Sequence, residues 1–267
     1  MRRQSTLGPD TKSFHSIGIY TADPDLEHEA KTLAAQLDLP IIRNKSQVET
    51  ALILSPDGLS LARPNYLKMT GTVQIDFTGR AWKRRIKRVR EERLVKAMGK
   101  NRHKNAGIID ATGGLGRDSF LLAAAGFTVR TFERNPVLAA LLADGLHRAS
   151  LQAATSEICN RIRFTHGNVI DFLYTGAATA EIIYLDPMFP KTTSTAKVKK
   201  ELQIIRHVTG EDHDIDKLFA LALQAAGERV VVKRPKKGPW LNDIRPAYSL
   251  EGKTIRFDVY LGSSLSP

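Results

Sequence analysis

A short apolar strand that runs into a glycine-rich turn and a helix constrains the fold of this chain more than any other feature. Residues 107–118 read Gly-Ile-Ile-Asp-Ala-Thr-Gly-Gly-Leu-Gly-Arg-Asp, and an apolar helix pattern follows over 119–125. Glycine lets the backbone turn sharply and approach a ligand closely. A second strand, 127–133, ends in Glu133, whose carboxylate suits the two hydroxyls of a ribose. The pattern predicts an α/β domain that binds an adenosine-containing cofactor.

The spacing of the glycines favours one class of cofactor. Gly113, Gly114 and Gly116 do not fit the G-x-G-x-x-G pattern of nicotinamide-binding folds. Residues 110–116 instead resemble the D-x-G-x-G-x-G turn of methyltransferases that use S-adenosylmethionine (SAM), with Thr112 in place of the first glycine. We therefore expect SAM as the cofactor, with Asp110 and the three glycines at its binding site.

A third strand pattern leads into a motif that indicates the acceptor. Residues 181–186 read Glu-Ile-Ile-Tyr-Leu-Asp and continue as Pro187-Met-Phe-Pro. Asp186 to Phe189 resemble the D/N-P-P-Y/F motif of methyltransferases that modify exocyclic amines of bases. Such an amine is a poor nucleophile, and a carboxylate that accepts its N–H can orient its lone pair. Pro187 fixes the turn and Phe189 can stack on an extruded base. The plainer alternative is an ordinary Asp-Pro turn at the end of a strand.

The charge of the chain indicates a polyanionic partner. It has 40 Lys and Arg against 28 Asp and Glu, a net charge of +12. Basic residues concentrate in 80–104, where Trp82, Ile86 and Val89 give the segment an apolar side. We expect a basic connecting helix that binds phosphates, the alternative being a solvated charged face. Residues 233–237, Lys-Arg-Pro-Lys-Lys, are expected to line the approach for RNA.

Alternating strands and helices predict the domain organisation. Strands near 106–110, 127–132, 162–165, 181–186 and 229–234, separated by helical patterns, indicate a parallel sheet. The pattern at 254–261 is our candidate for an antiparallel strand inserted near the edge. We expect a flexible tail over 1–14, a small α+β domain over 15–79 with a last strand at 73–77, the basic helix over 80–104, and a Rossmann-like class I SAM methyltransferase domain over 105–267.

Several classes of protein are disfavoured by composition and pattern. The longest apolar run, 120–127, is too short to cross a bilayer, and the basic N-terminus lacks the apolar core of a signal peptide. A single cysteine, Cys159, fits a reducing cytoplasm. The seven histidines lack the spacing of a metal site. A cytoplasmic protein without membrane contact or metal is expected.

Four ordered motifs together resemble one family. The segments 110–118, 132–136, 184–190 and 231–235 are similar to those of the RsmJ family of 16S ribosomal RNA guanine-N2 methyltransferases. The resemblance is strong over about 105–262 and looser before it. It implies SAM as methyl donor and a guanine of the small ribosomal subunit RNA as acceptor.

Roles for the site residues follow from these motifs. Arg117 and Asp118 are expected at the amino-acid end of SAM, and Glu133 at the ribose, with Arg134 lining the pocket or facing solvent. Asn168 stands where many methyltransferases carry an acid for the adenine amine; the Val169 N–H can reach a ring nitrogen, and Asp171 is a rival. Asp186 is expected to orient the amine and accept its proton, while Phe189 stacks on the guanine.

Two other functions stay open at this point. An exocyclic-amine methyltransferase acting on DNA or on another RNA would use the same Asp-Pro-x-aromatic logic, although no separate DNA-reading motif is present. A non-catalytic RNA-binding protein of ribosome assembly is the other; it would be expected to have lost Glu133 or Asp186, and the sequence keeps both.

Overall fold

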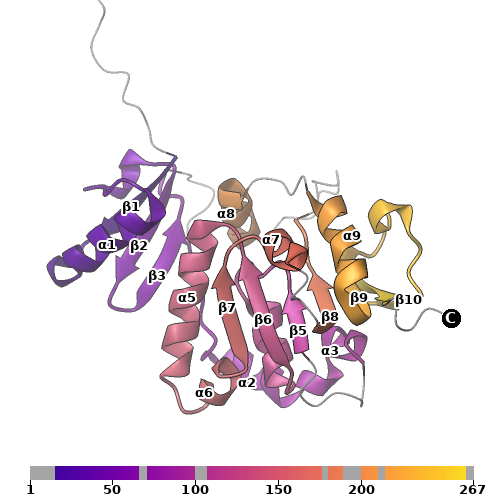
Figure 1. Cartoon of the computed structure of the whole chain (residues 1–267). Helices are drawn as coiled ribbons and strands as arrows, with labels where there is room; N and C mark the ends of the chain where they lie inside the picture. Colours follow the sequence, from indigo (N-terminus) through magenta and orange to yellow (C-terminus); the bar gives the residue numbers. More distant parts are fainter. Residues whose placement is uncertain are drawn as a thin grey trace, which may run out of the picture. The chain divides into compact units, whose positions relative to one another are not determined.

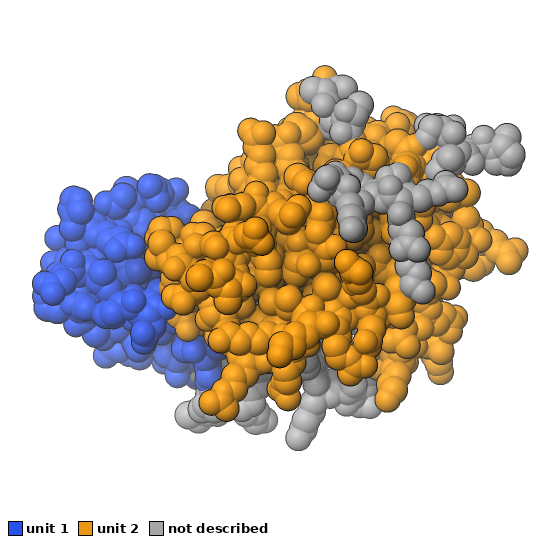
Figure 2. Space-filling view, turned by 90° about the horizontal axis from the view of Figure 1, so that it is seen from below, with its two compact units in different colours: residues 1–73 blue, residues 74–267 orange. Residues whose placement is uncertain are grey.

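The chain folds into two compact units. The computed structural model describes residues 16–65, 71–99, 107–175, 180–188, 200–209 and 214–262. Unit 1 is Met1–Val73 and unit 2 is Gln74–Pro267; Figure 2 colours them blue and orange. Each unit is considered by itself below.

Unit 1 is built on a four-stranded sheet of order β1-β2-β3-β4, with strands Ile17–Thr21, Thr50–Ser55, Gly58–Ala62 and Thr72–Gln74. Asp23 begins the helical segment, because its carboxylate accepts the Asp25 N–H and Pro24 follows it. A 3-10 turn, η1 (Pro24–Leu26), leads into α1 (Glu27–Leu37). Strands β2 and β3 pair antiparallel as a hairpin. The strand expected at 73–77 is shorter, because β4 ends at Gln74.

Unit 2 contains a seven-stranded sheet of order β10-β11-β9-β8-β5-β6-β7 (Figure 1). Its strands are β5 (Gly107–Asp110), β6 (Thr128–Glu133), β7 (Ile162–His166), β8 (Ala180–Leu185), β9 (Ala226–Pro235), β10 (Tyr248–Glu251) and β11 (Ile255–Leu261). Strands β5 to β9 pair parallel, and β11 lies antiparallel between β9 and β10. The predicted parallel sheet, with an antiparallel strand inserted near its edge, is confirmed.

Helices cover both faces of this sheet. The helices that follow β5 in the chain are α4 (Arg117–Ala124), α5 (Pro136–Ser150), α6 (Ser156–Cys159), α7 (Val169–Tyr174), α8 (Lys200–Thr209) and α9 (Ile215–Ala225). Apolar residues of α7 and α9, on the near face in Figure 1, pack on one side of the central strands, and those of α4 pack on the other. No helix in the described ranges is both long enough and apolar enough to cross a bilayer.

The basic segment is not the single helix that its sequence predicts. It forms three short pieces, α2 (Arg80–Lys87), η3 (Val89–Glu91) and α3 (Arg93–Ala97), all within unit 2; residues 100–104 lie outside the described ranges. The helix breaks at Arg88 (φ −115°, ψ 19°) and again at Glu92, whose backbone is extended. The breaks let Val89 and Leu94 both reach the buried cluster beneath α4. Core packing therefore outweighs helix propensity here.

Aromatic contacts fix α2 on α4. Phe77 stacks on Phe120 with ring centroids 4.2 Å apart, and the Trp82 ring meets Phe120 edge-on at 5.3 Å. Phe120 and Phe77 are fully buried. Such pairs add to the area they bury. This docking places the basic helix beside the first turn of α4, which carries functional residues.

Candidate active site

A cavity of about 410 Å³ lies where the strand order reverses between β5 and β8. Ligands of open α/β sheets collect at this point, beyond the carboxyl ends of the strands. The cavity wall includes these residues predicted from the sequence: Gly113, Gly114, Arg117, Asp118, Glu133, Arg134, Asn168, Val169 and Asp186. The structure thus brings together side chains from four separate strand ends.

The glycine-rich turn comes close to β6 and leaves room for a ligand. The Gly113 N–H donates to the Phe132 carbonyl over 2.7 Å, and a Cβ at Gly113 would lie 2.9 Å from that oxygen. Gly114 (φ +54°) and Gly116 (φ +69°) adopt left-handed backbone that favours glycine. A Cβ on Gly114 would meet only Thr112 O, at 4.0 Å, so it would extend into open space in the cavity wall. The turn therefore offers bare backbone to the cavity.

Asp110 lies beneath this turn, outside the cavity wall, as does Gly116. Its carboxyl is 1% exposed and accepts hydrogen bonds from the Thr112 N–H, at 3.2 Å, and from the Ser119 hydroxyl. Burial raises the pKa of Asp110 to about 7; the hydrogen bond from Ser119 opposes the rise and the nearby Asp118 adds to it. These contacts hold the turn from below.

Glu133 is fixed at the end of β6 by the backbone on both sides. Its Oε2 accepts the Gly114 N–H at 2.6 Å and its Oε1 accepts the Asn135 N–H at 2.7 Å. The residue is 8% exposed and lines the cavity. A carboxylate oxygen can accept more than one hydrogen bond, so this group is suited to ligand hydroxyls. An acceptor of this kind in the cavity wall fits the ribose of SAM.

Three charged groups from different elements, Asp118, Asp186 and Lys233, meet in the cavity wall. The Lys233 Nζ lies 2.8 Å from Asp118 Oδ2 and 2.7 Å from Asp186 Oδ2. The Tyr184 hydroxyl also donates to Asp118 Oδ2, at 2.7 Å. Parallel pairing of β8 with β9, with Leu185 opposite Val232, brings the residues that follow into contact. A lysine thus bridges two carboxylates.

Electrostatics favours the charged form of this cluster. Burial disfavours the Asp118 carboxylate, but the charge and hydrogen bond of Lys233 outweigh it and lower the pKa of Asp118. Burial likewise disfavours the Lys233 ammonium, and the two carboxylates raise the pKa of Lys233 well above its usual value. Lys233 is consequently a fixed cation at neutral pH.

The cavity is completed by the turns after β6 and β7. Asn168 caps α7, since its Oδ1 accepts the Ile170 N–H at 3.0 Å; the Val169 N–H, in the first turn, has no intrahelical acceptor. Asp171 does not line the cavity. Arg134 Nη1 donates to both carboxylate oxygens of Asp214, at 2.7 and 2.8 Å, and both residues line the cavity. Of the three residues considered for the adenine, Asn168 and Val169 line the cavity.

Several residues that line the cavity were not predicted as site residues from the sequence. Lys233 was expected on an RNA approach, and Arg85 on a phosphate-binding helix, yet both line the cavity. Tyr184 and Thr112 also line it; the Thr112 hydroxyl accepts the Asp186 N–H at 2.6 Å. The sequence signal that could have placed Lys233 in the site is its position at the end of a buried strand. Phe189 lies outside the described residues.

The described residues contain no group of three or more His, Cys, Asp or Glu side chains that could hold a metal ion. The bare turn, the Glu133 carboxylate and the α7 N-terminus instead match the parts of an adenosine-containing cofactor.

Comparison with known proteins agrees with this site. The family model described as "Putative SAM-dependent methyltransferase" matches residues 32–262. The ribosomal RNA small subunit methyltransferase J of Thioalkalivibrio sulfidiphilus is 41% identical over 251 residues, which is 92% of this chain and 97% of that protein. The protein of the same name from Aeromonas salmonicida is 38% identical, covering 93% of this chain and 98% of its own.

A solved structure supports the fold as well. The SAM-dependent methyltransferase of Neisseria gonorrhoeae is 32% identical and superposes with a TM-score of 0.69, over 94% of this chain and 97% of that one. The predictions of a SAM-dependent methyltransferase and of SAM as the cofactor are confirmed. The chain therefore belongs to the ribosomal RNA small subunit methyltransferase J (RsmJ) family.

Proposed function

We propose that this protein transfers a methyl group from SAM to the exocyclic N2 amine of a guanine in the small-subunit (16S) ribosomal RNA. The observation that carries the proposal is Asp186, which follows β8 in the cavity wall and is held beside Lys233. The RNA substrate is the one named for the relatives, ribosomal RNA of the small subunit. The choice of guanine N2 rests on the amine-methylase motif and on the family resemblance.

Different residues of the cavity bind different parts of the cofactor. Glu133 accepts the ribose hydroxyls, and the Asn168 side chain and Val169 N–H bind the adenine. Arg117 and Asp118, in the first turn of α4, meet the amino-acid end. When bound, SAM supplies an electrophilic methyl group on its sulfonium.

Asp186 acts on the acceptor. Its carboxylate accepts one N–H of the guanine amine and so directs the nitrogen lone pair, and it can take up the proton released after transfer. The Lys233 ammonium at 2.7 Å favours the ionised carboxylate, which is the form that accepts. Thr112 fixes the backbone of Asp186 through its hydroxyl. Orientation and proton acceptance are thus the contributions of this chain.

The basic surface supports an RNA partner. The net charge is +12, and α2 exposes Arg80, Lys83, Arg84 and Lys87. Basic groups of this kind neutralise backbone phosphates without reading sequence. A ribosomal substrate also agrees with the cytoplasmic location expected from the single cysteine.

The test is methyl transfer from radiolabelled SAM to small ribosomal subunits, protein-free 16S RNA and duplex DNA. The ribosomal acceptors come from cells that lack the corresponding methyltransferase. Digestion to nucleosides should place the label in N2-methylguanosine from the ribosomal RNA. Label in DNA would instead indicate an exocyclic amine of DNA as the acceptor. Absence of label from every acceptor would favour a non-catalytic RNA-binding role.

Asp186→Asn is the matched catalytic variant. It keeps the size of the side chain and removes the charge, so transfer to the RNA should fall by at least about 100-fold. Asp171→Asn, an exposed change outside the cavity wall, serves as control. Undiminished transfer by Asp186→Asn would remove the amine-orienting role.

A further inference from the structure

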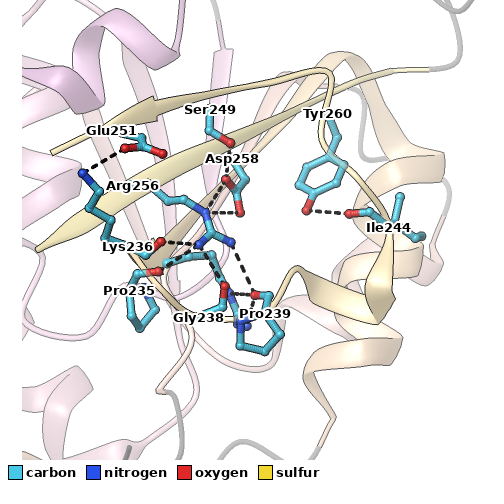
Figure 3. Close-up of polar contacts among 11 residues, drawn as sticks. Pro235, Lys236, Gly238, Pro239, Ile244, Ser249, Glu251, Arg256, Asp258 and Tyr260 are labelled. Carbon is cyan, nitrogen blue, oxygen red and sulfur yellow. Dashed lines mark hydrogen bonds and ion pairs between the residues drawn. The ribbon is translucent and has the colours of Figure 1, made fainter. Parts of the chain in front are cut away.

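A buried arginine holds the loop that follows β9 (Figure 3). The Arg256 Nη1 donates to the carbonyl oxygens of Pro235, Lys236 and Gly238 at 3.1, 2.7 and 2.8 Å. Arg256 is 6% exposed, and its Nε donates to Asp258, which is fully buried. A guanidinium taken out of water is stable only when its donors are satisfied. Here loop carbonyls satisfy most of them.

The remaining part of the loop is fixed at further points. Arg234 donates through Nε and Nη2 to Pro239 O, at 3.0 and 2.6 Å. Leu241 is buried in the core cluster that includes α9, and the Tyr260 hydroxyl donates to Ile244 O at 3.2 Å. The segment 235–244 is therefore held at several points by contacts within the protein.

This fixed loop presents an indole and two lysines. Trp240 is 41% exposed although both its neighbours in the loop are anchored. Lys236 and Lys237 are exposed as well, and Lys236 forms a surface ion pair with Glu251 at 3.0 Å. A half-exposed indole beside basic side chains is the combination that binds single-stranded nucleic acid.

Both ends of the loop are rooted in the walls of the active site. Lys233, two residues before Pro235 on β9, contacts Asp186. At the other end, the Asn242 amide donates to Asp216 O in α9, over 3.4 Å, and α9 contributes Ile215 to the cavity wall. The loop is therefore attached to two elements, β9 and α9, that contribute residues to the cavity wall.

We propose that Trp240 is a stacking platform for an unpaired base of the RNA that flanks the target nucleotide, with Lys237 contacting a neighbouring phosphate. The inference rests on the proposed function and deepens it by naming a substrate contact outside the catalytic cavity. Arg256 and Arg234 hold the backbone that leads into Trp240, so less ordering of the loop opposes binding.

Fluorescence tests this contact without any need for methyl transfer. The chain has two tryptophans, so Trp82→Phe leaves Trp240 as the sole indole. The probes are a single-stranded RNA decamer and an abasic ribose-phosphate decamer of equal charge. Quenching by the RNA and not by the abasic chain is expected, because only bases stack. Equal quenching by both, or none by RNA, would overturn the inference.

Steady-state kinetics on 16S RNA provides the second test. Trp240→Ala should raise the KM for RNA by at least about fivefold, which corresponds to the lower end of the free energy of one base–aromatic stack. The factor by which KM rises should exceed the factor by which kcat falls. Trp240→Phe should recover most of the loss. Ile244→Ala removes another exposed apolar side chain of the loop, 43% exposed, and should match the parent. If Trp240→Ala behaves like Ile244→Ala, the platform is excluded.

The two proposals fail in distinguishable ways. If the parent protein methylates RNA and Trp240→Ala leaves the RNA KM unchanged, the platform fails and the methyltransferase proposal stands. If no acceptor is methylated, the quenching titration still decides whether Trp240 contacts RNA bases.

Discussion

The Lys233 ammonium lies 2.7 Å from the Asp186 carboxylate, and the same nitrogen contacts Asp118 at 2.8 Å. One cation thus joins the first turn of α4 to the end of β8. Because these two carboxylates raise the pKa of Lys233, the lysine stays protonated and cannot serve as the base. Its role is to keep two acids ionised and close together.

Replacing Lys233 by methionine should therefore damage both stability and turnover. Two carboxylates would remain near each other without their cation, and loss of one partner of a largely buried pair costs about 3 kcal/mol. Urea unfolding at pH 7.5 measures the stability, and methyl transfer at saturating SAM measures the turnover. Lys236→Met, which breaks the exposed pair with Glu251, should cost under about 1 kcal/mol. Similar losses for the two variants would contradict a special role for Lys233.

Acidification should act on the same cluster in a definite direction. The pKa of Asp118 is lowered in the folded protein, so its contribution to stability is present above its ordinary value and is lost as pH falls through the lowered one. In Lys233→Met that contribution is absent, and the difference in stability between parent and variant should shrink toward pH 3.

The pKa of Asp110 is shifted in the opposite direction, so its contribution to stability has the opposite dependence on pH. Its pKa is raised from 3.8 to about 7 by burial, so between those values the unfolded chain releases the proton and the folded protein keeps it. Stability contributed by this group therefore falls as pH rises from about 4 to 7, by about 4 kcal/mol at most. Asp110→Asn should lack this slope. Urea denaturation at pH 5, 6, 7 and 8 measures it, with the exposed Asp171→Asn as control.

A parallel pH dependence for parent and Asp110→Asn would show that Asp110 is ionised throughout. The carboxyl would then need a stronger donor than the Thr112 N–H and the Ser119 hydroxyl provide.

The sequence predicted this fold well because its determinants are local. Gly113 and Gly116 sit where the backbone requires glycine, and Asn135 caps α5 as its place before Pro136 predicts. Strand positions followed from apolar runs of the right length. These features need no knowledge of distant contacts, so the sheet, including its inserted strand β11, could be anticipated.

The site was only partly predictable, because its key contacts join distant segments. Lys233 meets Asp118 across 115 positions of sequence, and Arg134 meets Asp214 across 80. The sequence around Lys233 or Arg134 does not indicate which distant residue it will contact. The prediction of one continuous basic helix was wrong for a related reason. The apolar residues of this segment pack into the core beneath α4 and do not lie on one helical face.

Glu133 offers a direct test of the cofactor site. Its carboxylate accepts two backbone N–H groups and lines the cavity, where it can accept ribose hydroxyls. In Glu133→Gln one of these N–H groups would face an amide donor, so SAM affinity should fall by about 10- to 100-fold. Calorimetric titration of SAM and of S-adenosylhomocysteine measures it, and the exposed Glu157→Gln is the control. Unchanged affinity for both ligands would place the ribose elsewhere.

Two neighbouring arginines of α2 should separate cofactor binding from RNA binding. Arg85 lines the cavity and pairs with Glu92 at 2.6 Å, whereas Arg84 is exposed. Arg85→Ala should weaken SAM binding severalfold, because a cation near Asp118 is lost. Arg84→Ala combined with Lys87→Ala should leave SAM binding intact and lower the salt dependence of RNA binding by up to about two ion equivalents.

The measurement is RNA affinity by filter binding between 50 and 250 mM salt, with SAM affinity by calorimetry. Glu91→Gln, on the same segment and paired with Arg88 at 2.6 Å, removes an acid and should leave the salt slope no lower than in the parent. An unchanged slope in Arg84→Ala with Lys87→Ala would mean that α2 serves the cavity through Arg85 and takes no part in holding RNA.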